Sequence, residues 1–119
     1  MRSRAEQFDD LVLDSVERLD EHLGGRLDGV EFVVDEVPPD PRTLPADGAW
    51  VDDPVPLGHS FRATSDANGR VVVYRRPVEA RADGRTDLAA LIHVVVVQQV
   101  SELFGIPPEE VDPTLLDDD

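Results

Sequence analysis

The chain has no cysteine and no lysine, and aromatic residues occupy only 5% of its 119 positions. Without cysteine it can form neither a disulfide nor a zinc site with thiolate ligands, and nothing in it requires an oxidising compartment. We expect no membrane-spanning run of about 18 apolar residues, and the N-terminal sequence MRSRAEQFDD lacks the apolar region of a secretory signal. These absences lead us to expect a soluble, cytoplasmic protein.

Positive charge is also scarce. Eleven basic residues, all of them arginine, stand against 26 acidic ones, which gives a formal net charge of −15. Such a field repels nucleic-acid phosphates and anionic lipid head groups, so we expect neither nucleic acid nor a membrane as a partner. The exclusive use of arginine is more typical of a high-GC genome or a salt-adapted proteome than of a functional device.

Length and composition predict a single domain. A chain of 119 residues with 40% hydrophobic content can bury one modest core and is too short for two. We therefore expect one domain over residues 1–119, with an ordered core at about 4–112 and an acidic tail at 113–119. Leu115 and Leu116 in that tail could dock in a partner groove, although such charge runs are usually only solvated.

The stretch around which the chain is organised is Asp87–Asp112, DLAALIHVVVVQQVSELFGIPPEEVD, its longest apolar run. The β-branched residues Val94–Val97 fit a buried strand as easily as a buried helix. Length and flanking residues favour a helix over about 87–104, because Thr86 or Asp87 can cap its start and Gly105, followed by two prolines, ends it. Its apolar side chains then share one broad face: Leu88, Leu91, Ile92, Val95, Val96, Val100, Leu103 and Phe104.

Gln98 and Glu102 lie one turn apart on another face of this helix, with Gln99 beside them. The segment VVQQVSELFGI resembles the H-E-x-x-H-x-x-G helix of the minimal zincin-like metallopeptidases, a family of small bacterial proteins, and Gly105 fixes the alignment. In that motif two histidines one turn apart bind zinc, and the intervening glutamate takes a proton from the zinc-bound water. The resemblance implies that Gln98 and Glu102 stand at the histidine positions, Gln99 at the base position and Pro108 at the third ligand position.

These substitutions remove the chemistry that the family's motif carries. An amide oxygen is a weak ligand for zinc and a proline side chain is none, which leaves Glu102 as the one good ligand. Gln99 cannot take a proton from water. We therefore expect no zinc cofactor, no intact catalytic or metal site, and a non-catalytic zincin-like domain with a protein or peptide partner. The alternative is a residual zinc-dependent metallopeptidase that combines Glu102 with acids such as Glu109 or Asp112.

The remaining segments predict an α+β fold. Arg4 to Leu23 has the apolar spacing of an amphipathic helix, and Val30–Val34 alternates as a strand does. A short second strand is expected around Val55, Leu57 and Phe61, and a third at Val71–Tyr74 after the turn SDANGR. We expect an N-terminal helix, a sheet of three or four strands, the motif helix packed across it, and a short helical turn from Pro107.

The resemblance covers roughly Glu6 to Val111, and VVVYRRPVEA fits a family signature of apolar strand, arginine and proline. In the resembling family the edge strand of the sheet lies beside the metal cleft and pairs with an extended peptide. The proline-rich segment from Val37 to Pro54 is expected to be a long loop, with Trp50 packed over the edge of the core.

The three histidines are expected to be structural or solvated. His22 lies near the end of the first helix, His59 in a loop, and His93 at the core edge, where it is satisfied or half-exposed. At about 100° per residue His93 faces some 140° away from Gln98, so the two cannot share a metal. No other catalytic constellation stands out, and three serines read as isolated: Ser60, Ser65 and Ser101.

Overall fold

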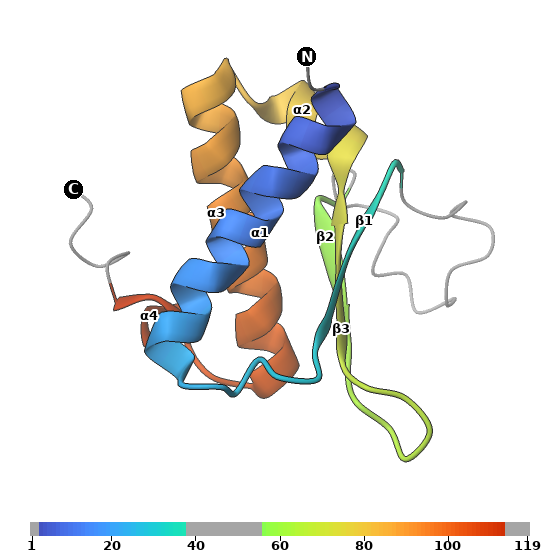
Figure 1. The fold of residues 1–119 in the computed structure, drawn as a ribbon, viewed down its shortest axis with the longest axis vertical. Coiled ribbons are helices and arrows are strands. Elements are labelled where there is room, and N and C mark those ends of the chain that lie inside the picture. The colour runs from blue at the N-terminus through green and yellow to red at the C-terminus, as the bar shows by residue number, and fades with distance from the viewer. Residues whose placement is uncertain (1–2, 38–55, 114–119) are drawn as a thin grey trace.

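The computed structural model describes residues 3–37 and 56–113, which form two long helices beside a small sheet (Figure 1). The element order confirms the predicted α+β class. The helices are α1 (Arg4–Leu23), α2 (Arg75–Arg81), α3 (Arg85–Phe104) and α4 (Pro108–Val111), and the strands are β1 (Glu31–Asp35), β2 (Gly58–Phe61) and β3 (Arg70–Tyr74).

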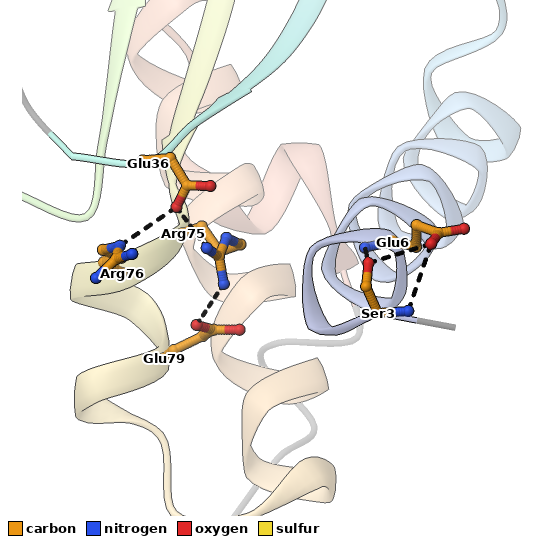
Figure 2. Close-up of polar contacts among 6 residues, drawn as sticks. All are labelled: Ser3, Glu6, Glu36, Arg75, Arg76 and Glu79. Atoms are coloured by element: carbon orange, nitrogen blue, oxygen red, sulfur yellow. Dashed lines mark hydrogen bonds and ion pairs between the residues drawn. The ribbon is translucent and has the colours of Figure 1, made fainter. Parts of the chain in front are cut away.

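Helix α1 has the bounds that its sequence predicts. Ser3 accepts a hydrogen bond from the backbone N–H of Glu6, and the Glu6 carboxylate accepts one from the N–H of Ser3, which completes a capping box (Figure 2). Gly24 ends the helix in the left-handed region at φ 57°, where glycine carries no Cβ penalty. Phe8, Val12 and other apolar residues of this helix are buried in the core, as its amphipathic spacing predicts.

The sheet has the order β1-β3-β2, with β1 parallel and β2 antiparallel to the central β3. Because β3 has a neighbour on each side, Val71–Tyr74 is buried, as expected for its continuous apolar run. The turn before β3 forms where expected: the Thr64 hydroxyl accepts hydrogen bonds from the backbone N–H groups of Asp66 and Ala67. The sheet of the described residues therefore has three strands, the lower of the two predicted numbers.

Helix α2 is absent from the sequence prediction. It has only seven residues and carries Pro77 at its third position, two features that argue against a helix when the chain is read alone. Pro77 is nevertheless compatible with the first turn, because the backbone N–H that proline lacks has no intrahelical partner there. In the structure, the segment VVVYRRPVEA is therefore the end of strand β3 followed directly by helix α2.

Helix α3 is the centre of the core, and the choice of helix over strand for its valines is confirmed. It packs against α1 as well as against β2 and β3. This double packing explains why Val97 and His93 are buried although the single predicted face omits them. Its start also differs, since Gly84 precedes the first turn and the Asp87 carboxylate accepts a hydrogen bond from the N–H of Asp83 instead of capping the helix.

By length and composition α3 is also long and apolar enough to cross a membrane, which the sequence analysis did not expect. The central helix of a soluble domain passes the same test, and α3 owes its apolar character to the core it shares with α1 and the sheet. The predictions for Trp50, for Val55, for the loop that ends at Pro54 and for Leu115 and Leu116 fall outside the described residues.

Candidate functional site

One stripe of α3 faces outward at four-residue spacing. Val94 is 37% exposed, and Gln98 and Glu102, which follow it at successive turns, are exposed as well. The helix therefore presents the two side chains at the predicted histidine positions on its accessible side, one turn apart, as the alignment expects. Neither side chain is packed into the core.

Gln99 turns instead toward the sheet. A Cβ atom built on Gly58 of β2 would lie 3.2 Å from the Gln99 side chain and 3.0 Å from a methyl group of Val95. The Gln99 Oε1 atom is buried, and within the described part of the chain it has no hydrogen-bond partner. The residue at the predicted base position is thus an uncharged acceptor held in the seam between α3 and the edge strand β2.

Gly105 ends α3 at φ 67°, in the left-handed region where glycine carries no Cβ penalty. The N–H of Ile106 donates to the carbonyl of Ser101, and the Ser101 hydroxyl donates to the carbonyl of Ile106. The chain then enters α4, whose first residue is Pro108. Pro108 is exposed and brings no ligand atom to this turn.

The donor set on this side of α3 does not fit zinc. Zinc in proteins takes imidazole nitrogen, thiolate or carboxylate, and the four aligned positions offer one carboxylate, two amides and a proline. The acids named in the alternative do not complete the set. Asp112 is buried and hydrogen-bonded to His93, while Glu109 is exposed on α4. Over residues 3–37 and 56–113, no three histidine or acidic side chains are grouped to hold a metal.

Comparison with known families identifies the chain's relationship: the sequence model for the zincin-like metallopeptidases matches residues 27–115. The chain belongs to this family. A search of the curated proteins found no match. The matched region includes the sheet, α3 and the turn after Gly105, but it begins after α1, so the family resemblance is shorter than the span from Glu6 to Val111 that the sequence analysis predicts.

In this zincin-like protein the arginine of the strand signature ties the end of β1 to α2. Arg75, the first residue of α2, donates to Glu36 just after β1 at 2.5 Å and to Glu79 of α2 at 2.9 Å, while Arg76 contacts Glu36 at 3.4 Å (Figure 2). The hydrogen bond from Arg75 is the main cause that lowers the pKa of Glu36. Arg75 therefore fixes the end of β1 and the start of α2 to each other.

The zincin-like fold also brings together three residues that the sequence does not connect. His93 Nδ1 lies 2.7 Å from Ser15 Oγ of α1, and His93 Nε2 lies 2.5 Å from Asp112 Oδ2, just after α4. All three side chains are buried. The expectation that His93 is satisfied at the core is confirmed, and its hydrogen-bond partners are two residues that the sequence analysis did not connect with it.

The other histidines are unremarkable in position. His59 is half-buried in β2, not in a loop, and its ring meets Phe61 edge to face at 4.6 Å between centroids. His22 is exposed in the last turn of α1, as expected for a solvated residue.

Proposed function

We propose that this zincin-like domain has lost zinc binding and peptide hydrolysis and has kept the surface on which the family holds an extended peptide. The observation that carries the proposal is Gln99, an uncharged amide at the base position, whose side chain lies against β2 and whose oxygen is buried. A glutamine side chain does not ionise near neutral pH, so it cannot act as a general base wherever a metal is bound. The lack of cysteine supports a cytoplasmic setting.

Loss of the metal follows from the same set of residues. Tight zinc binding must offset the dehydration of the ion, and one exposed carboxylate at Glu102 with an amide at Gln98 is too weak a set for this. The residual metallopeptidase finds no support in the positions of Glu109 and Asp112, since the second is engaged by His93. Binding without hydrolysis is the function that fits these residues.

The peptide-facing surface that we propose is the outer edge of β2. In the described residues β2 pairs with β3 on one side, and the N–H of Tyr74 donates to the carbonyl of Leu57. Because backbone groups alternate along an antiparallel pair, His59 and Phe61 direct theirs to β3, and Ser60 directs its N–H and carbonyl to the opposite edge. An extended chain can add there by strand pairing.

Side chains around this edge suit such a ligand. Phe61 is 47% exposed and Val94 of α3 is 37% exposed, so apolar contact is available on both the strand and the helix. Gln98 adds an amide that can both donate and accept hydrogen bonds with peptide groups. Backbone pairing with side-chain amides recognises peptide shape and requires little of the ligand's sequence.

Zinc titration by calorimetry tests the loss of the metal site. We expect no one-to-one zinc binding by the unmodified chain, freed of any affinity tag. The variant Gln98→His, Glu102→His, Pro108→Asp should bind zinc, and adding Gln99→Glu should then permit hydrolysis, because only this form has a base for the bound water. Tight binding by the unmodified chain would overturn the proposal, and no binding by the first variant would show that the alignment on Gly105 is wrong.

Backbone NMR with a tryptic digest of casein, a mixture of unstructured peptides, tests the proposed edge. Peptide binding should shift the amide resonances of β2 and of Gln98 and Gln99. The variant Ser60→Pro removes an N–H from the outer edge and leaves the ladder to β3 intact, so it should abolish these shifts while the domain stays folded. Shifts confined to other surfaces, or unchanged in Ser60→Pro, contradict peptide binding at β2.

A further inference from the structure

We propose that Ser15, His93 and Asp112 form a second reactive site, in which Ser15 is a nucleophile of the acyl-transfer type. Its preferred substrates are small, neutral or cationic esters. Ser15 and His93 are the catalytic residues, and Asp112 is a positioning residue that acts through His93. The site is independent of the motif positions on α3.

The hydrogen bonds run in the direction that nucleophilic catalysis needs. An ionised carboxylate only accepts, so Asp112 Oδ2 requires the proton on His93 Nε2, 2.5 Å away. His93 Nδ1 then carries a lone pair and accepts the hydroxyl proton of Ser15 over 2.7 Å. The opposite tautomer would point a bare nitrogen at the carboxylate, which is repulsive. The imidazole is therefore held ready to act as a base toward Ser15.

A cleft gives access to this chain of hydrogen bonds. Ser15 and His93 line a cavity of about 420 Å³ between α1 and α3, together with the apolar side chains of Leu11 and Ala89. Although Ser15 and His93 are only 3% and 8% exposed, they border open space and are not enclosed in the core. A nucleophile needs only this one open direction.

The charges around the cleft define the substrate class. Asp14, Glu17 and Glu21 of α1 line it and disfavour acids. Arg18 also lines it, three residues after Ser15 and thus on the same face of α1, and no described residue forms an ion pair with it. Since the N–H groups inside α1 are used by the helix, Arg18 is the group that can stabilise an oxyanion.

The reaction proceeds in two balanced steps. Ser15 Oγ attacks the carbonyl carbon of an ester while its proton passes to His93 Nδ1, and Arg18 faces the negative oxygen of the tetrahedral intermediate. The bond to the leaving alcohol breaks, and His93 returns the proton to that alcohol. Water then attacks the acyl group on Ser15 with the same proton transfers, releases the carboxylic acid and restores the serine.

Two observations separate this site from the peptidase motif. His93 lies five residues before Gln98, so the two face directions about 140° apart around α3. Ser15 belongs to α1, which precedes the family-matched residues 27–115. Loss or retention of zinc chemistry on the other face therefore has no bearing on the nucleophile.

The experiment is covalent labelling with an alkyl fluorophosphonate, read by intact mass and peptide mapping. We expect one adduct, on Ser15, and none in Ser15→Ala. His93→Gln should slow labelling by about 100-fold, the size of effect that removal of a general base produces. Ser65→Ala changes an exposed serine in the turn before β3 and is the matched control, with an unchanged rate. An absent adduct on the folded chain, or one at another residue, overturns the proposal.

A second measurement separates reactivity from packing. Two-dimensional NMR of the imidazole nitrogens should show the His93 proton on Nε2 in the unmodified chain. In Asp112→Asn the amide N–H donates to Nε2, the proton moves to Nδ1, and labelling of Ser15 should slow by at least about tenfold. If the cluster is purely structural, Asp112→Asn should lower thermal stability but leave the labelling rate of Ser15 unchanged, and this result overturns the proposal. A proton on His93 Nδ1 in the unmodified chain overturns it as well.

Discussion

Gly58 of the edge strand β2 lies directly against Gln99 of α3. A methyl group at position 58 would come within 3.2 Å of the Gln99 side chain and within 2.9 Å of the backbone carbonyl oxygen of Val72, an atom that cannot move without the sheet. We predict that Gly58→Ala costs about 1–3 kcal/mol in the free energy of unfolding, measured by urea denaturation.

Gly69→Ala is the matched control, because neither glycine has a positive φ and the difference lies only in the neighbours. The nearest atoms to a Cβ on Gly69 are two methyl carbons of Leu103 at 3.4 Å, which a flexible side chain can adjust. Its cost should stay within about 0.5 kcal/mol. Equal costs for the two substitutions would mean that α3 does not approach β2 as closely as described.

The two sides of α3 should differ in stability when truncated. Val96 is fully buried, so Val96→Ala removes packed methyl groups and should cost about 1–3 kcal/mol. Gln99→Ala removes a buried oxygen that no described residue satisfies, and it should cost little or even stabilise the fold. If urea denaturation ranks Gln99→Ala as the more destabilising change, the glutamine is a structural hydrogen-bonding residue.

Arg75 should matter more than its neighbour Arg76. The Arg75 side chain is 14% exposed and donates to two carboxylates, whereas Arg76 is 69% exposed with one long contact. We expect Arg75→Ala to cost about 1–3 kcal/mol and Arg76→Ala to stay within about 0.5 kcal/mol. Because Arg75 lowers the pKa of Glu36, the benefit is present above the ordinary carboxylate pKa and fades as pH falls through the lowered one. Equal costs at neutral pH contradict this role.

The long helices were predictable because several local signals agree in them. Arg4–Leu23 combines an apolar face, an acid in its first turn and Gly24, and it begins and ends where these signals do. In α3 the valines by themselves favour a strand, but the length of the apolar segment and the glycine that ends it, Gly105, predict the helix that the structure has. Helix α2 could not be predicted in this way, because it is short, has no side-chain cap, follows a strand directly and contains Pro77.

The cluster of Ser15, His93 and Asp112 could not be read from the sequence. Its members lie 78 and 19 positions apart, and their meeting depends on how α1 and α4 pack on α3. One signal was present, since Ser15 interrupts the apolar face of its helix and His93 precedes a run of valines. A polar residue on a core-facing position needs a partner, but only the fold identifies which one.

Tyr74 provides a pH-dependent test of the core. It is buried at the end of β3, and this burial is the main cause that raises the pKa of its phenol above the ordinary value of 10.0, with the charge of Asp35 on β1 as the second cause. The folded state therefore holds the phenol proton more tightly than the unfolded state does. The contribution of the Tyr74 phenol to the free energy of unfolding is fully present below about pH 10, the ordinary pKa, and is lost as pH rises through the raised pKa of the folded state.

The chain has a single tyrosine, so absorbance at the phenolate band reports this group without overlap from another. We expect a titration midpoint above 10 in the folded protein, and unfolding in urea should return it to the ordinary value. Asp35→Asn removes the neighbouring charge but not the burial, so it should lower the midpoint only in part. A midpoint at or below 10 in the folded chain would show that the end of β3 is open to water, and the position of α2, which begins at the next residue, would have to be revised.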